Sequence, residues 1–200
     1  MKKLIPLLIL LGGGATGFSQ GTITFQNSVV FQTVDPSGGN RLVYNPGPSA
    51  VTGNGIGLAG TQWVAELYAG TSAGSLAPVT ASTSRFRGST TASKGKWALT
   101  AIAGANDFVV TPIDFGQTGT FQVKVWDLSA FNTYEAAVAA GGTTGASLVF
   151  TMKVPVAGDT FIPDFYMENL QAFALVVPEP SAVALSVLGV AGLLLIRRRK

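Results

Sequence analysis

The chain has 200 residues, 47% of them hydrophobic and 12% charged, and it contains no histidine and no cysteine. This composition excludes Ser-His-Asp and Cys-His nucleophile systems and zinc sites built on histidine or cysteine. The net charge of +3 comes from the two ends, because residues 21–177 hold seven basic and nine acidic residues, a net charge of −2. The basic isoelectric point therefore does not predict a nucleic-acid partner.

The first nineteen residues have the pattern of a secretory signal peptide. Lys2 and Lys3 precede an apolar run at residues 4–11, and residues 12–19 are small and turn-prone. The apolar run is too short to span a membrane. We expect cleavage after Ser19, with Gly17 as the alternative, so that the rest of the chain is exported.

Residues 20–177 are expected to form one antiparallel all-β domain, a single β-sandwich or jelly-roll-like fold. Short alternating runs are separated there by clusters of Gly, Pro, Asn and Asp. The strongest strands are expected at 61–69 and 119–127, with Trp63, Leu67, Phe121, Val123 and Val125 buried. Weaker strands are expected at residues 22–25, 29–31, 41–44, 76–79, 84–87, 96–100, 108–111, 146–153 and 170–177.

One short helix is expected between the strands. Asn132 is the expected N-cap, and Glu135 lies three residues later, where a capping box would place it. Residues 136–140 are mostly good helix formers, and Gly141 and Gly142 end the helix. We expect this helix to link the strand of residues 119–127 to the next strand.

A glycosidase needs only two carboxylates, so the acidic residues are the remaining catalytic candidates. The body carries Asp35, Glu66, Asp107, Asp114, Asp127, Glu135, Asp159, Asp164 and Glu168. Several have simpler explanations as turn residues or, for Glu135, as part of a capping box. The sequence contains no Asp-x-Asp-x-Asp-Gly loop, the pattern that predicts a calcium site. We expect no metal, no cofactor and no catalytic activity.

The three tryptophans are the candidates for stacking on sugars. Trp63 lies on the core face of its strand, so we expect it to pack in the core. Trp97 follows Lys94 and Lys96, which favours exposure and makes it the candidate glycan contact. The pattern does not decide which environment Trp126 has.

The most definite pattern is at the C-terminus. Pro178-Glu179-Pro180 is followed by the uncharged run Ser181 to Ile196 and then by Arg197, Arg198, Arg199 and Lys200. The prolines keep the triplet extended and outside any helix. The 16-residue run would form a helix about 24 Å long at about 1.5 Å per residue, against a bilayer core of about 30 Å. The terminal cations should stay in the cytoplasm and leave the body outside.

This tail resembles the PEP-CTERM sorting signal of Gram-negative bacteria, through residues 177–181, the apolar span and the terminal Arg cluster. The resemblance implies processing by an exosortase-type membrane protease, with a cut near Pro178-Glu179-Pro180. It also implies that residues 181–196 lie in the lipid bilayer of an inner-membrane intermediate. The alternative interpretation is an ordinary single-pass tail anchor.

Three stretches of the body, at residues 65–70, 123–127 and 134–137, resemble PEP-CTERM cargo of the Verrucomicrobia. That resemblance implies export but no established activity. We therefore expect an exported structural protein of the cell surface or extracellular matrix, in the setting of exopolysaccharide production. A glycan-binding module is the alternative, followed by a carboxylate-dependent glycosidase.

Overall fold

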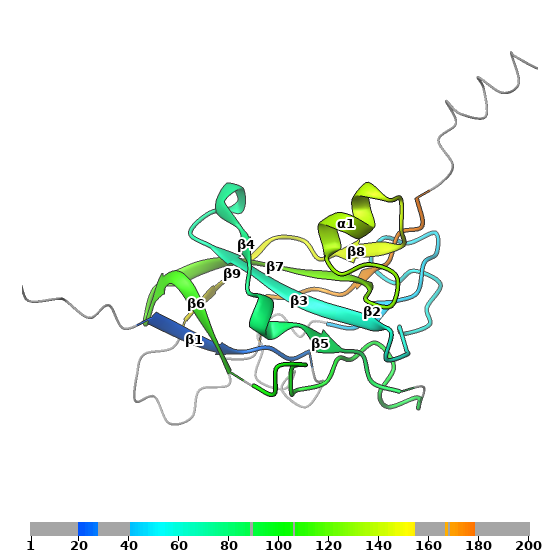
Figure 1. Cartoon of the computed structure of the whole chain (residues 1–200), viewed down its shortest axis with the longest axis horizontal. Coiled ribbons are helices and arrows are strands. Elements are labelled where there is room, and N and C mark those ends of the chain that lie inside the picture. Colours follow the sequence, from blue (N-terminus) through cyan, green and yellow to red (C-terminus); the bar gives the residue numbers. More distant parts are fainter. Residues whose placement is uncertain are drawn as a thin grey trace, which may run out of the picture.

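The computed structural model describes residues 20–27, 41–88, 90–105, 107–154, 167 and 169–178. Within these ranges strands predominate (Figure 1), and the helical segments are α1 (Tyr134–Ala139) and the 3-10 turns η2 (Ala73–Ser75) and η3 (Thr80–Ser82). The expected all-β class is confirmed. The predicted signal peptide, the predicted strand at 29–31 and the tail from Glu179 onward lie outside the described residues.

The main sheet is built around two long antiparallel strands, β3 (Trp63–Gly70) and β7 (Thr118–Asp127). Their register runs from Trp63 opposite Asp127 to Gly70 opposite Thr120. They are the two strands that alternation predicted most strongly. Four short strands extend the sheet: β4 (Ala77–Pro78) and β5 (Ser84–Arg85) pair with β3, and β8 (Thr144–Ala146) and β9 (Phe150–Lys153) pair with β7.

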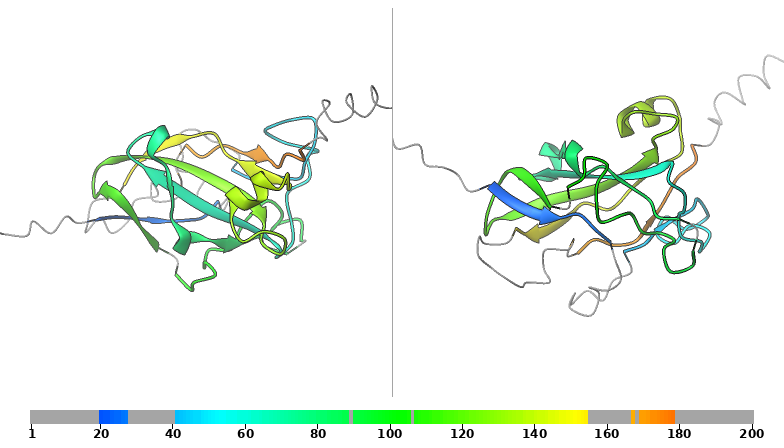
Figure 2. Two further views of the ribbon diagram at one scale, coloured as in Figure 1. Left: turned by 45° about the horizontal axis from the view of Figure 1, so that its top comes forward. Right: turned by 60° about the horizontal axis from the view of Figure 1, so that its bottom comes forward.

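Two smaller sheets lie opposite the main sheet (Figure 2). β1 (Gln20–Thr24) pairs antiparallel with β6 (Asp107–Asp114), whereas β2 (Val43–Tyr44) pairs in parallel with β10 (Phe173–Ala174). The prediction of a wholly antiparallel domain is wrong for this last pair. Alternation indicates which residues share a face, but it does not fix the direction of two strands that lie far apart in the chain.

The main hydrophobic core lies between these layers. Leu67, Phe121, Val123 and Val125 from the main sheet are fully buried there, as predicted. Trp63 packs against the same core but is only partly buried. Apolar residues of the smaller sheets face them: Ile23, Phe108, Val110, Val43 and Phe173. Burial of each large apolar side chain contributes about 1.5–3 kcal/mol, so this cluster is the main source of stability.

The predicted strand at 146–153 is interrupted. β8 ends at Ala146 and β9 begins at Phe150, because Ser147 turns its hydroxyl into the sheet. Its Oγ accepts a hydrogen bond from Val123 N at 2.9 Å and donates one to Leu148 O at 2.8 Å. A side-chain hydroxyl thus takes the place of a backbone partner, which alternation does not reveal.

The second face of the β3–β7 pair is also covered. Val64 and Trp126 lie opposite each other on this face and form a small apolar cluster with Ala137 of α1. We call this side, which points away from the main core, the outer face. Figure 1 shows α1 lying over it, beside β7 and β8.

Candidate functional site

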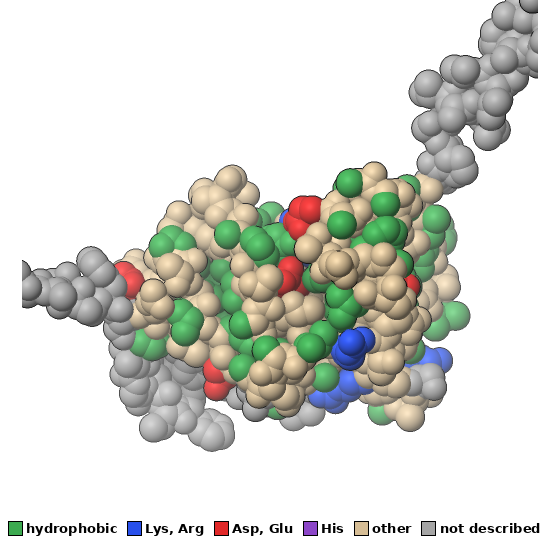
Figure 3. Space-filling view, in the orientation of Figure 1, with side chains coloured by type: hydrophobic (Ala, Val, Ile, Leu, Met, Phe, Trp, Pro, Cys, Tyr) green, Lys and Arg blue, Asp and Glu red, His purple; other side chains and the backbone are tan. Residues whose placement is uncertain are grey.

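A pocket of about 350 Å³ lies on the outer face. Its floor consists of Glu66 and Tyr68 from β3 and Trp126 from β7. One side comes from the segment of β4 and η3, and the other from α1 and the residues just before it, including Glu135. We call this cavity the outer pocket. Figure 3 shows this side of the molecule, where acidic side chains lie among hydrophobic ones near α1 and basic ones gather elsewhere.

The register of the sheet places these side chains together. Glu66 pairs with Lys124, and Val64 pairs with Trp126, so all four project from the same face. α1 then brings Glu135 over them. Its N-cap is Thr133, whose Oγ1 accepts a hydrogen bond from Ala136 N at 3.1 Å.

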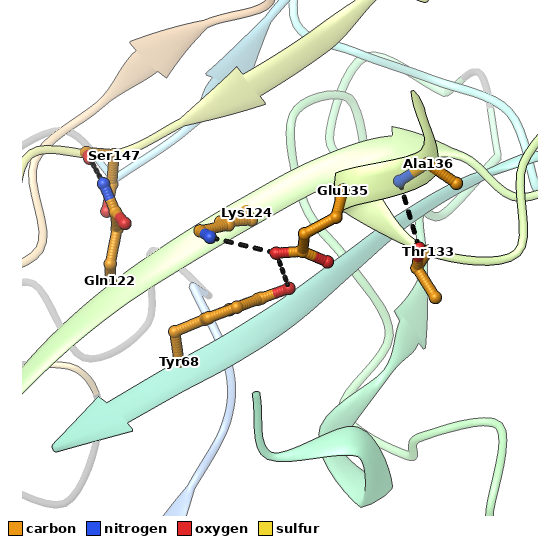
Figure 4. Close-up of polar contacts among 7 residues, drawn as sticks. All are labelled: Tyr68, Gln122, Lys124, Thr133, Glu135, Ala136 and Ser147. Carbon is orange, nitrogen blue, oxygen red and sulfur yellow. Dashed lines mark hydrogen bonds and ion pairs between the residues drawn. The ribbon is translucent and has the colours of Figure 1, made fainter. Parts of the chain in front are cut away.

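The expectation that Asn132 caps the helix, with Glu135 completing a capping box, is therefore wrong. The cap lies one residue later, and both Asn and Thr are good N-caps, so composition alone did not separate them. The carboxylate of Glu135 turns toward the sheet. The Tyr68 hydroxyl donates a hydrogen bond to Glu135 Oε1 at 2.8 Å, and Lys124 Nζ lies 3.2 Å from the same oxygen (Figure 4).

Lys124 is held by two aromatic rings as well as by this ion pair. Its Nζ lies 3.7 Å from the centroid of the Tyr68 ring and 4.7 Å from that of Tyr134. Both distances are within the range of cation–π attraction. The ammonium therefore fixes α1 to the sheet through charge and through contact with ring faces.

Glu66 is a buried carboxyl at the floor of the outer pocket, with 4% of its surface exposed. Thr83 donates a hydrogen bond to its Oε1 at 3.0 Å. Burial, together with the nearby charge of Glu135, raises the pKa of Glu66, although the Thr83 hydrogen bond and Lys124 oppose this. Within the part of the chain that the structure describes, no lysine or arginine lies within ion-pair distance of Glu66.

The other carboxyl of the pocket has the opposite character. Glu135 loses some hydration, but hydrogen bonds from Tyr68 and Lys124 outweigh this loss and hold the pKa of Glu135 below its ordinary value. Burial and the hydrogen bond to Glu135 raise the pKa of Tyr68, so its hydroxyl remains a donor. The two carboxyls thus differ in their tendency to hold a proton.

The structure separates the three tryptophans by environment. Trp97 is 1% exposed, so the expectation that it is an exposed glycan contact is wrong. Its ring stacks on Phe25 with centroids 4.7 Å apart, and its Nε1 donates to Phe25 O at 3.1 Å. The lysine before it misled the prediction, because a strand-like alternation turns residue 96 outward and residue 97 inward.

Trp126, which the sequence left undecided, is buried under α1. Its Nε1 donates to Phe131 O at 2.9 Å, and its ring meets Tyr134 edge-on with centroids 6.5 Å apart. The sequence holds a signal for its burial, although not for the pocket itself. An aromatic residue on the face opposite a predicted core face indicates that both faces are covered.

Of the acidic residues, the structure brings Glu66 and Glu135 to one pocket. Asp107 accepts a hydrogen bond from Thr24 at the surface, and Asp127 accepts one from Ser129 N at 2.8 Å in a turn. Asp35, Asp159, Asp164 and Glu168 lie outside the described residues. Among those that are described, no group of three residues suited to holding a metal occurs.

The processing motif begins at the end of the last described range, 169–178. Val176 N donates to Thr144 O at 2.7 Å, and Val177 and Pro178 follow as exposed residues. Glu179, Pro180 and the terminal cations Arg197 to Lys200 lie beyond the described residues. No helix in the described part of the chain is long and apolar enough to cross a membrane.

Comparison with protein families finds one match, to the PEP-CTERM protein-sorting motif, at residues 176–200. The chain carries a PEP-CTERM sorting motif. The motif indicates a protein that is sorted to the cell surface by an exosortase, which is a membrane protein. No curated protein and no solved structure matches the chain. The body must therefore be interpreted from its own residues.

Proposed function

We propose that the folded body is a non-enzymatic structural protein of the cell surface or extracellular matrix, released from a membrane-held intermediate by cleavage near Pro178-Glu179-Pro180. The observation that supports this is where the fold ends. Phe173 and Leu175 are buried in the main core, Val176 is the last of the described residues to pair with another segment, and Val177 is exposed. A cut after these residues leaves the core of the described part of the chain intact.

The intermediate is held by the rest of the motif. Ser181 to Ile196 lies in the bilayer, and Arg197 to Lys200 stays in the cytoplasm, because moving each charge through hydrocarbon is costly. The small residues of the span let a partner helix approach closely, which suits handling by a membrane enzyme. An ordinary tail anchor would not need an extended Pro-Glu-Pro triplet at its outer edge.

The test is to change Pro178, Glu179 and Pro180 together to alanine and to measure location and intact mass in the native cell. We expect export to continue while the uncut chain accumulates in the membrane. The matched control is Pro48→Ala, in an exposed loop of the body. Recovery of the triple variant at the wild-type mass and location would show that the triplet is a linker and would contradict the proposal.

The two alternatives, a glycan-binding module of the exopolysaccharide matrix and a carboxylate-dependent glycosidase, now concern the outer pocket. Trp97 no longer supports glycan binding, since its ring is buried. Turnover of an oligosaccharide that is abolished by Glu66→Gln would replace the non-enzymatic proposal. The likeness of the body to cargo of the Verrucomicrobia stays a prediction.

A further inference from the structure

The residues that line the outer pocket lie between Glu66 and Glu135, outside the sorting motif at residues 176–200. The pocket lies on the outer face, and its size of about 350 Å³ falls within the range of about 300–1,000 Å³ that is usual for small-ligand sites. Its lining includes residues from the three stretches of the body that resemble PEP-CTERM cargo. Glu66 and Tyr68 come from 65–70, Trp126 from 123–127 and Glu135 from 134–137.

The charges at the pocket do not balance. Glu66 and Glu135 together carry two negative charges when ionised, and Lys124 supplies one positive charge, which leaves a net charge of −1. Lys124 is bound to Glu135 at 3.2 Å. The charge without a close cation is therefore that of Glu66, the more deeply buried of the two. A buried charge is costly unless an opposite charge pairs with it.

The walls suit a small organic cation better than a hydrated metal ion. Pro78, Ile102 and Leu128 supply apolar surface, and Thr80 adds a hydroxyl. An alkyl or sugar carrier can cover the apolar walls while its ammonium reaches the carboxylate. The chain already shows this kind of recognition nearby, where the Lys124 ammonium is held by Glu135 and by the Tyr68 ring.

We propose that the outer pocket binds a small organic ammonium, as carried by an alkylamine or an amino sugar, with Glu66 as its anionic partner. The ligand's ammonium supplies the positive charge that the pocket lacks, and its carrier excludes water from the apolar walls. Lys124 remains bound to Glu135 in the complex. This proposal does not depend on the sorting of the protein.

Binding should weaken at low pH, because Glu66 must be ionised to attract the cation. Its pKa is raised, so protonation begins above the pH at which an ordinary glutamate titrates. The charged or titratable groups that face it are Tyr68 on its own strand, Lys124 on β7 and Glu135 on α1. η3 and residues 99–105 contribute none.

The experiment is isothermal titration calorimetry of the full-length chain in nonionic detergent. Two matched ligand pairs separate charge from carrier: pentylamine with 1-pentanol, and glucosamine with N-acetylglucosamine. We expect the charged member of at least one pair to bind about tenfold or more tightly than its neutral partner, a difference of about 1.4 kcal/mol. The pair that responds identifies the carrier as alkyl or sugar.

Two variants locate the site. Glu66→Gln keeps an acceptor for Thr83 but removes the charge, and should weaken ammonium binding about tenfold or more. Ala103→Trp, on an exposed loop that lines the pocket, should fill it and abolish binding of every ligand. The control is Asp114→Asn, the same loss of charge on β6 and outside the pocket, which should leave the affinity unchanged.

Several outcomes would overturn the proposal. Equal affinity for both members of each pair, including no binding of either, would exclude recognition of an ammonium. An equal loss in Asp114→Asn would show that only the overall charge matters. Calcium binding that Glu66→Gln removes, without ammonium binding, would assign the pocket to an inorganic cation. None of these results bears on the processing test, so the two proposals fail independently.

Discussion

On the inner face of the β3–β7 pair, Leu67 and Val123 lie opposite each other, and both side chains belong to the main hydrophobic core. One residue along each strand, on the outer face, Glu66 lies opposite Lys124 beneath a short helix. The strands and their register are the same, but one face gains stability by excluding water and the other holds charge. The difference indicates that the outer face is not optimised for stability alone.

The largest effect on stability is expected from a substitution in the core at the inner face. Phe121→Ala should lower the free energy of unfolding by about 3–5 kcal/mol, since the side chain is fully buried and the sheet cannot close over the cavity. Urea denaturation of the full-length chain in nonionic detergent measures this. Val109→Ala, at a half-exposed position on β6, is the control and should change stability by less than about 0.5 kcal/mol. Equal losses would mean that the core does not lie where the structure places it.

The next largest loss of stability is expected at the outer face, when the N-cap of α1 is removed. Thr133→Ala removes the acceptor for Ala136 N and should cost about 1 kcal/mol, with a spread of about 0.5–2 kcal/mol. Asn132→Ala is the matched control and should cost much less. The same denaturation experiment distinguishes them. A larger loss of stability in Asn132→Ala than in Thr133→Ala would show that Asn132 is the N-cap, as the sequence suggested.

The two faces of the β3–β7 pair also differ in how well their features could be predicted from the sequence. Alternation was enough to predict the inner face, because period 2 and apolar content are local properties of β3 and β7. It did not predict the outer pocket, which needs α1, η3 and residues 102–103 to meet over one face. Glu135 was explained as a capping residue because its partners, Tyr68 and Lys124, are 67 and 11 residues away.

The tail presents the opposite case. Its signal is contiguous, so the order of triplet, apolar run and cations was sufficient for prediction, and the family match at residues 176–200 agrees with it. Trp97 shows the limit of such local reasoning. Its neighbours suggested exposure, but its environment is set by Phe25 and by Asn27, whose Oδ1 accepts from Trp97 N at 3.2 Å.

A smaller effect is expected where charge fastens α1 to the sheet. Lys124→Met removes the ion pair with Glu135 and the contacts with two rings, while it keeps the aliphatic length of the side chain. Glu135 is 60% exposed, so we expect a loss of only about 0.5–1 kcal/mol. The loss should shrink in 1 M salt. Lys153→Met, on an exposed position of β9, should change nothing measurable and controls for the change in net charge.

We expect the smallest effect from Glu66, since the Thr83 hydrogen bond and Lys124 offset part of the cost of its burial. Because its pKa is raised in the folded state, the folded chain holds this proton more tightly than the unfolded chain. Stability should therefore fall as pH rises from the ordinary value of 4.5 through the raised pKa, and the cost should be complete above it. Glu66→Gln lacks this titration. Urea denaturation across pH measures the free energy of unfolding of both proteins. The variant should gain stability relative to wild type between about pH 4, where Glu66 is protonated, and about pH 7, where it is ionised. If the difference in unfolding free energy between variant and wild type is constant with pH, burial does not destabilise the ionised form of Glu66. The outer face would then resemble an ordinary solvated surface.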